Sequence, residues 1–171
     1  MLKGQDILVL LRLLEAPDGW TVRSIGAPIG LDPAGVHRAL KRLDEARLVN
    51  VERRQVNRSN AEEFLVHGLK YLFPAQQGGM SRGVPTAWAA PPLSEDLASV
   101  DEPPPVWPDA RGKARGVSLE PLHRKALEIA QRDPGLAERL ALIDAIRIGD
   151  GRIRSLAERR LSESLRALEQ S

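Results

Sequence analysis

The stretch 21–49 constrains the fold most, because it carries start and stop signals for short helices in close succession. Thr21 can accept a hydrogen bond from a free backbone N–H and so cap a helix over residues 22–29. Gly30 can adopt the left-handed conformation that ends this helix. Pro28 lies near the same end, so the last turn is expected to be short or tightened.

The next signals predict a second helix over residues 33–46. Asp32 is a second N-cap, and Pro33 follows at the favoured first helical position. Apolar residues then recur at i, i+4 and i+7, at Val36, Leu40 and Leu43. A Leu-Val pair follows as the start of a strand. This order of helix, turn, helix and strand is typical of a DNA-binding helix-turn-helix.

The face of the second helix opposite its apolar stripe is polar and mostly basic. At about 100° per residue, its members are Ala34, Arg38, Lys41 and Glu45, with His37 and Arg42 beside them. Arginine and histidine can donate to base edges, and lysine can neutralise phosphate. The pattern therefore predicts contact with double-stranded DNA. A solvated amphipathic helix with no such contact is the alternative interpretation.

Residues 2–58 resemble the winged-helix domain of MarR-type bacterial transcription regulators. The resemblance rests on the leading helix GQDILVLLRLLE, on the two helices described above and on the run RALKRLDEARLVNVERR. It implies a recognition helix followed by a strand and a basic wing. Residues implied in or beside the major groove are Gly35, His37, Arg38, Lys41 and Arg42. Thr21 and Arg23 are implied near a phosphate, and Arg53, Arg54 and Arg58 on or near the wing.

The wing departs from the pattern of these regulators, because its second strand is hard to find. Asn60 has the character of another N-cap, with Glu63 at the third helical position. A helix is therefore predicted over residues 61–72. The wing is expected to be a stub formed by residues 51–57.

The sequence divides into three parts and predicts a mainly α protein. Residues 1–73 form the predicted winged helix-turn-helix domain with its reduced wing. Residues 74–117 are expected to be an extended Pro/Gly-rich connector, since eight of the 13 prolines lie between Pro74 and Pro108. Trp88 and Trp107 favour an ordered connector that docks its tryptophans on helices over a free linker. Stacking of a tryptophan on a nucleobase is a further alternative.

Residues 118–171 return to helical periodicity and are expected to form two or three helices. Ser118 is a candidate cap for the first helix, and Asp133-Pro134 is a second cap followed by a first-turn proline. The Gly-Asp-Gly run at 149–151 is either a turn or a weak point in one long helix. The apolar stripes can pack on the rest of the chain or on a second copy, so a homodimer is one expected arrangement.

The run 62–93, EEFLVHGLKYLFPAQQGGMSRGVPTAWAAPPL, resembles a block in small bacterial winged-helix proteins. Some of these proteins are encoded beside nucleotidyltransferase-type toxins, in the manner of abortive-infection antitoxins. The resemblance implies an antitoxin or autorepressor with a cognate toxin as partner. It assigns no catalytic residue.

Composition and motifs argue against an enzyme. The formal net charge is only +2, so a DNA-binding chain must gather its positive charge on one face. The absence of cysteine excludes disulfides and thiolate metal sites. The three histidines are far apart, and no catalytic motif is present, so neither a metal nor a cofactor is expected. No signal peptide or membrane span is recognisable, which predicts a cytoplasmic protein.

We therefore expect a sequence-specific DNA-binding transcriptional regulator, a repressor or autorepressor, that reads the major groove with helix 33–46. The alternative is a protein-interaction adaptor or antitoxin whose winged helix binds a partner protein instead of DNA. Arg38 and Lys41 favour DNA, whereas Glu45 and the reduced wing favour the adaptor.

Overall fold

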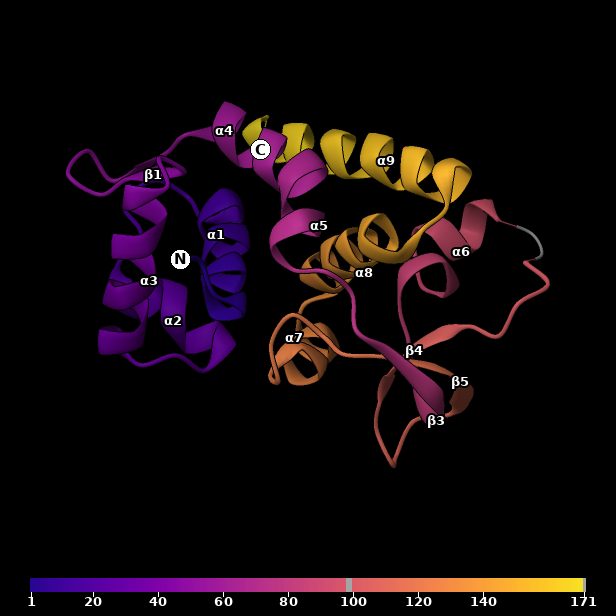
Figure 1. Ribbon diagram of the computed structural model, residues 1–171. Coiled ribbons are helices and arrows are strands. Elements are labelled where there is room, and N and C mark those ends of the chain that lie inside the picture. The colour runs from indigo at the N-terminus through magenta and orange to yellow at the C-terminus, as the bar shows by residue number, and fades with distance from the viewer. Residues whose placement is uncertain (98–99, 171) are drawn as a thin grey trace. The chain divides into compact units, whose positions relative to one another are not determined.

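The computed structural model describes residues 1–97 and 100–170, and it is mainly helical, as the sequence predicts (Figure 1). Its contacts divide the chain into two compact units. The N-terminal unit comprises Met1–Phe64 together with the residues from Leu165 onward, and the central unit comprises Leu65–Ser164. This division differs from the predicted one, because the segment expected to be a connector belongs to the same unit as most of the C-terminal helices.

The N-terminal unit begins with three helices, which Figure 1 draws in indigo and violet. Helix α1 is nearly all buried and packs against α2 and α3. The apolar stripe predicted on α3 also lies in this core, since Val36, Leu40 and Leu43 are buried. The helices are α1 (Gly4–Glu15), α2 (Val22–Gly26), the 3₁₀ turn η1 (Ala27–Ile29) and α3 (Pro33–Glu45).

The predicted capping signals of α2 and α3 are confirmed. The Thr21 hydroxyl accepts a hydrogen bond from the Ser24 backbone N–H at 3.0 Å. Gly30 has φ of 68°, so it ends the first helical segment in the left-handed conformation, after the tightened turn that contains a proline. The Asp32 carboxylate accepts from the Gly35 N–H at 2.7 Å. Local sequence chemistry therefore determines where these helices begin and end.

A short antiparallel hairpin follows α3. Strands β1 (Val49–Asn50) and β2 (Gln55–Val56) pair over only two residues each. Helix α4 (Arg58–Glu63) then begins earlier than predicted, because Asn57 is its N-cap and Asn60 donates its backbone N–H to the Asn57 side chain at 3.0 Å. The prediction of Asn60 as the cap is therefore wrong.

The predicted helix 61–72 is present but interrupted. After α4 the chain passes through a π-helical segment, Phe64–Gly68, before α5 (Leu69–Leu72). A π-helical turn shifts the helical register by about one residue relative to an α-helix. The boundary between the two units falls at the start of this segment.

The expected connector is partly a sheet, so its description as extended chain alone is wrong. Strands β3 (Gln77–Pro85), β4 (Pro105–Pro108) and β5 (Ala114–Leu119) form a small closed sheet in which β3 is antiparallel to both others and β4 is parallel to β5. Glycines permit this tight closure: a Cβ at Gly116 would overlap the Pro104 carbonyl oxygen, and one at Gly83 would overlap that of Trp107.

Helices complete the central unit, and α8 is buried over Arg139–Ile146 and at Leu136. The predicted cap of α8 is confirmed, since the Asp133 side chain accepts from the Leu136 N–H at 3.0 Å. Ser118 lies in β5, so its predicted role as a helix cap is wrong. Residues 149–150 separate α8 from α9, so the Gly-Asp-Gly run interrupts the helix instead of lying within one long helix. The elements are the 3₁₀ turn η3 (Ala87–Ala89), α6 (Leu93–Asp96), α7 (Ala126–Arg132), α8 (Pro134–Ile148) and α9 (Gly151–Glu169). The end of α9, from Leu165, belongs to the N-terminal unit.

Candidate functional site

The N-terminal unit exposes part of the predicted DNA-binding set on one helix. His37, Arg38 and Lys41 are exposed on α3, on the side opposite its buried stripe. Glu45 is exposed one turn further along. Arg23 on α2 and Arg53 in the hairpin turn are exposed as well. Thr21 is also exposed, but its hydroxyl caps α2.

Gly35 does not belong to this exposed face. It is buried, and its N–H donates to the Asp32 carboxylate. A Cβ at this position would lie 3.0 Å from the Asp32 carboxylate oxygen. Gly35 therefore serves the tight first turn of α3, and its predicted place in or beside the groove is not supported.

Arg42 turns inward and stabilises the packing of α3 on α1. Its Nε and one terminal nitrogen donate to the two oxygens of Asp6 at 2.7 and 2.8 Å. The Asp6 carboxylate is fully buried and also accepts from the Lys3 backbone N–H at 2.7 Å. The hydrogen bond to Asp6 raises the pKa of the Arg42 guanidinium. We therefore remove Arg42 from the candidate DNA-binding face.

Two of the three predicted wing arginines are also committed to the protein itself. The Arg54 guanidinium donates to the Trp20 carbonyl and lies 4.5 Å from the centroid of the Trp20 ring, a cation–π contact. Arg58 lies in the first turn of α4, not in the hairpin, and donates to the Leu14 carbonyl at 3.2 Å. Their positive charge supports the loop between α1 and α2, so of the three only Arg53 remains in the candidate face.

The turn of the hairpin is held by side chains on both sides. An oxygen of Asp44, at the end of α3, accepts from the Val51 N–H at 3.0 Å. The Asn50 side chain accepts from the Arg53 N–H at 2.9 Å. Arg47 was not predicted as a site residue, yet it is exposed just after α3 with φ of 63°. A non-glycine residue in this conformation turns the chain sharply and places one more cation beside the hairpin.

The central unit contains a buried polar network around Asp144 on α8. One carboxylate oxygen of Asp144 accepts from the Thr86 hydroxyl at 2.7 Å and from the Trp107 indole N–H at 2.8 Å. The other accepts from Arg147 at 3.0 Å. Burial raises the pKa of the Asp144 carboxyl, although Arg147 and the three hydrogen bonds act in the opposite direction. The network ties the sheet to the central helix, which agrees with the expected docking of a tryptophan on a helix.

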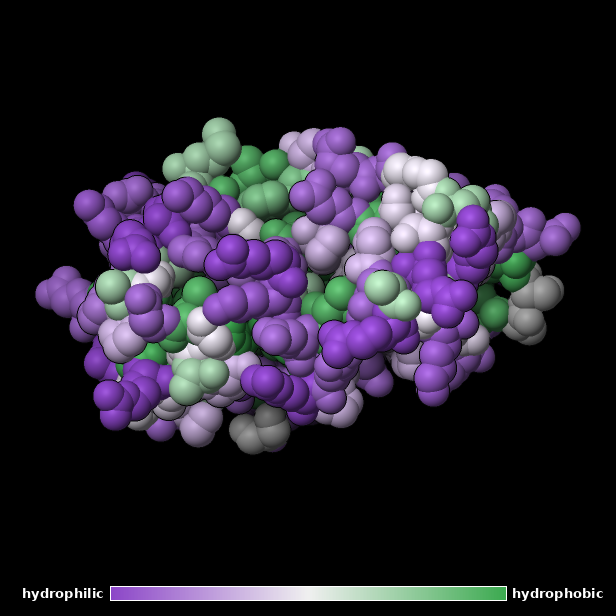
Figure 2. All heavy atoms as spheres, turned by 90° about the horizontal axis from the view of Figure 1, so that it is seen from below, coloured by the Kyte–Doolittle hydropathy of each residue, from purple (hydrophilic) through white to green (hydrophobic). Residues whose placement is uncertain are grey.

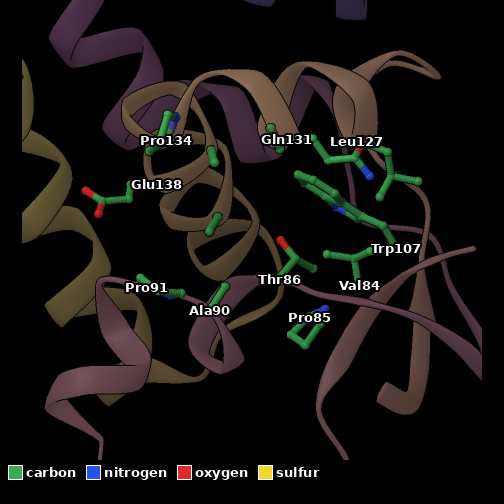
Figure 3. Close-up of a pocket in the computed structure, with 13 residues that line it drawn as sticks. Val84, Pro85, Thr86, Ala90, Pro91, Trp107, Leu127, Gln131, Pro134 and Glu138 are labelled. Atoms are coloured by element: carbon green, nitrogen blue, oxygen red, sulfur yellow. The ribbon is translucent and has the colours of Figure 1, made fainter. Parts of the chain in front are cut away.

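A pocket of about 320 Å³ lies beside this network (Figure 3). Helix α8 contributes Pro134, Ala137, Glu138 and Ala141 to its wall. Helix α7 contributes Leu127, Ala130 and Gln131. The opposite side is formed by the end of β3, by the chain around Pro91 and by Trp107. All of these residues belong to the central unit, so the pocket is a property of that unit alone.

The outer face of the sheet carries exposed cations. Arg82 on β3 and Arg115 on β5 are exposed and stand directly opposite each other in the antiparallel register. Lys113, just before β5, is exposed as well. On the face of the molecule that Figure 2 shows, hydrophilic side chains cover most of the area and hydrophobic patches are separate and small.

Within residues 1–97 and 100–170, no cluster of three or more histidine, aspartate or glutamate side chains has the arrangement of a metal site. None of the helices in the same residues combines the length and hydropathy that crossing a membrane requires. Comparison with protein families, with curated proteins and with solved structures gives no match to this chain.

Proposed function

We propose that the N-terminal unit is a winged helix-turn-helix with a reduced wing, and that the chain is a sequence-specific DNA-binding transcriptional regulator. The observation that carries the proposal is the exposed face of α3, where His37, Arg38 and Lys41 stand on a helix whose other side is fixed in an apolar core. A helix packed on a core holds the backbone positions of these side chains fixed, so such a face is suited to reading the major groove.

The roles follow from the chemistry of each side chain. Arg38 donates to base edges, where an arginine can bind guanine in a bidentate manner. Lys41 neutralises a backbone phosphate, and Arg23 and Arg53 add phosphate contacts from α2 and from the hairpin. Fewer wing cations than predicted take part, because Arg54 is engaged with Trp20. We therefore expect the affinity to depend mainly on α3.

The test is fluorescence anisotropy with duplex DNA from upstream of the chain's own gene, compared with a scrambled duplex at near-physiological salt. We expect preferential binding to the upstream fragment. The variant Arg38→Ala/Lys41→Ala should weaken this binding, whereas Arg132→Ala/Arg152→Ala, which removes two exposed positive charges from the central unit, should weaken it less. Equal affinity of the wild type and the α3 variant would refute the proposal.

Salt dependence gives an independent readout. The logarithm of the binding constant falls with the logarithm of salt concentration by about 0.9 for each phosphate neutralised on duplex DNA. Removing Lys41 should therefore reduce the slope by about one. A binding constant that does not change with salt would contradict the proposed phosphate contacts. The symmetry of a footprint on the upstream fragment would show whether a homodimer binds.

The second candidate is a protein-interaction module, an adaptor or an antitoxin that neutralises a toxin partner. The observation that favours it is that Arg42, Arg54 and Arg58 make internal contacts. The exposed face of α3 therefore carries only a modest positive charge, and Glu45 lies beside it. Weak and equal binding to both duplexes, together with copurification of one specific protein that the Arg38→Ala/Lys41→Ala variant loses, would favour this function over DNA binding.

A further inference from the structure

The pocket of the central unit is hollow because small side chains face it from the helices. Ala137 and Ala141 lie on one side of α8, and Ala130 faces the same space from α7. Leucines at such positions would fill the space, as Leu136 and Leu140 do in the adjacent core. The resulting volume of about 320 Å³ lies within the range of small-molecule sites, which begins at about 300 Å³.

Trp107 provides a fixed aromatic wall. Its indole N–H is bound to the buried Asp144 carboxylate at 2.8 Å, and the same oxygen is held by Thr86 at 2.7 Å. The ring is therefore oriented before any ligand arrives, which lowers the entropy lost on binding. In Figure 3 the ring lies on the same side of the pocket as Leu127 and Val84. Only a small part of the ring remains accessible, since Trp107 is 3% exposed, so an aromatic ligand would meet this part edge to face.

The polar groups of the pocket select the sign of the ligand's charge. Thr86 and Trp107 donate their hydrogens to Asp144, so toward the pocket the hydroxyl can only accept and the indole presents only carbon. Among the lining residues, Glu138 is the only one with an ionisable side chain. Figure 3 shows it at the end of the pocket away from Trp107, with its carboxylate directed outward at the rim. Apart from the Gln131 amide, the site thus offers acceptors and negative charge.

We infer that this pocket binds a small aromatic amine, with its ring system beside Trp107 and its ammonium group at the rim near Glu138. A cavity of about 150 Å³ is large enough for benzene, so a space of about 320 Å³ accommodates a bicyclic ring with a short side chain. The ammonium group remains partly hydrated at the rim, which avoids the large desolvation penalty of a buried charge. This binding site is separate from the proposed DNA contact and does not depend on it.

The test uses 1-naphthylmethylamine as a cationic probe and 1-naphthoate as an anionic one, each titrated into the full chain by isothermal calorimetry. We expect the amine to bind more tightly than the carboxylate. Ala137→Leu should weaken the amine at least tenfold by filling the space. Glu138→Gln should weaken it about two- to fivefold, the range for an exposed ion pair, and should reduce the preference for the amine. Glu128→Gln, an exposed residue of α7 outside the lining, is the matched control and should change neither titration.

Thermal unfolding checks that Ala137→Leu remains folded, and Ala130→Leu replaces it if it does not. Backbone amide shifts induced by the amine should fall in residues 84–91, at Trp107 and in residues 127–141. Equal binding of the two probes to the wild type, or an Ala137→Leu or Ala130→Leu variant that is folded and binds the amine normally, would overturn the inference. The Arg38→Ala/Lys41→Ala variant should bind the amine like the wild type, so failure of the DNA proposal and failure of this one give different results.

Discussion

Arg38 and Arg42 lie one turn apart on α3, and the structure predicts opposite consequences for removing them. Arg38 is exposed, so Arg38→Ala should change the free energy of unfolding by less than about 0.5 kcal/mol. Among the residues that the structure describes, Arg42→Ala leaves the fully buried Asp6 carboxylate with the Lys3 N–H as its one remaining donor. From sequence, both arginines are predicted to contact DNA, whereas in the structure Arg38 is exposed and Arg42 binds Asp6.

The magnitude follows from the geometry of the pair. Breaking a buried ion pair by removing one partner costs about 3–5 kcal/mol. The Asp6 side chain is 0% exposed but that of Arg42 is 17% exposed, so water screens the pair in part. We therefore expect a loss of about 2–3 kcal/mol for Arg42→Ala. For a unit of this size, that corresponds to a decrease in thermal midpoint of about 10–20 °C.

The assay must report on the N-terminal unit, because two units need not unfold in one transition. Hydrogen exchange of the α1 amides provides that readout, and exchange in α8 serves as the internal control. Exchange in α1 should accelerate in Arg42→Ala and not in Arg38→Ala. Replacing both partners, Asp6→Leu with Arg42→Met, should recover much of the loss because no buried charge then lacks a partner. Equal stability of the two alanine variants would refute the reasoning.

Three further predictions concern the central unit. Thr86→Val removes a 2.7 Å hydrogen bond to the buried carboxylate of α8 and should cost about 1–3 kcal/mol by urea unfolding; an unchanged midpoint would contradict this. Burial, then the neighbouring Arg124 and Lys125, lower the pKa of His123. In the unfolded chain His123 has its ordinary pKa of 6.5, so below pH 6.5 the unfolded chain binds the proton more readily than the folded chain does. The free energy of unfolding should therefore fall as the pH decreases below 6.5. His123→Gln should remove that part of the pH dependence in unfolding measured between pH 7 and pH 5. Finally, Gly116→Ala should destabilise the sheet by about 3 kcal/mol, because the new Cβ would overlap the Pro104 carbonyl oxygen. Gly79→Ala should be tolerated, because a Cβ there meets nothing within 4 Å. Similar thermal midpoints for the two variants would refute the steric argument.

The elements that the sequence predicts well are those governed by local chemistry. Thr21, Gly30, Asp32 and Asp133 act within three residues of their own positions, so a single stretch of sequence contains the whole cause. The mainly α fold follows from the same signals together with helical periodicity. Asn57 was missed as a cap because Asn60 offers an equivalent side chain with a glutamate three residues later, and sequence alone does not rank the two.

The features that the sequence does not predict depend on contacts between distant residues. Asp6 and Arg42 are 36 positions apart, so no local pattern reveals that this arginine turns inward. A lone acid in the apolar run of α1 was the available signal, since a buried aspartate requires a partner. The closed sheet was missed because prolines and glycines suggest extended chain, whereas here glycines allow β3, β4 and β5 to approach closely.

The pocket could not be predicted for a related reason. Its walls come from residues between 84 and 141, and alanines on a helix have no distinctive pattern in sequence. Trp107 was singled out, but its fixed orientation depends on an aspartate 37 positions later. Seven members of the predicted DNA-binding set are exposed, but one of them, Arg54, is engaged with Trp20. The remaining three, Gly35, Arg42 and Arg58, make internal contacts.

The N-terminal unit is discontinuous in the chain, and this has a consequence for synthesis on the ribosome. Its last segment starts at Leu165, after all of the central unit, and includes Arg166, which pairs with Glu62 at 3.0 Å. Residues 1–64 therefore leave the ribosome about 100 residues before their C-terminal complement, which takes about 5–20 s at typical rates of elongation. Throughout this interval residues 1–64 lack the segment that completes their own unit, although they precede the central unit in the chain.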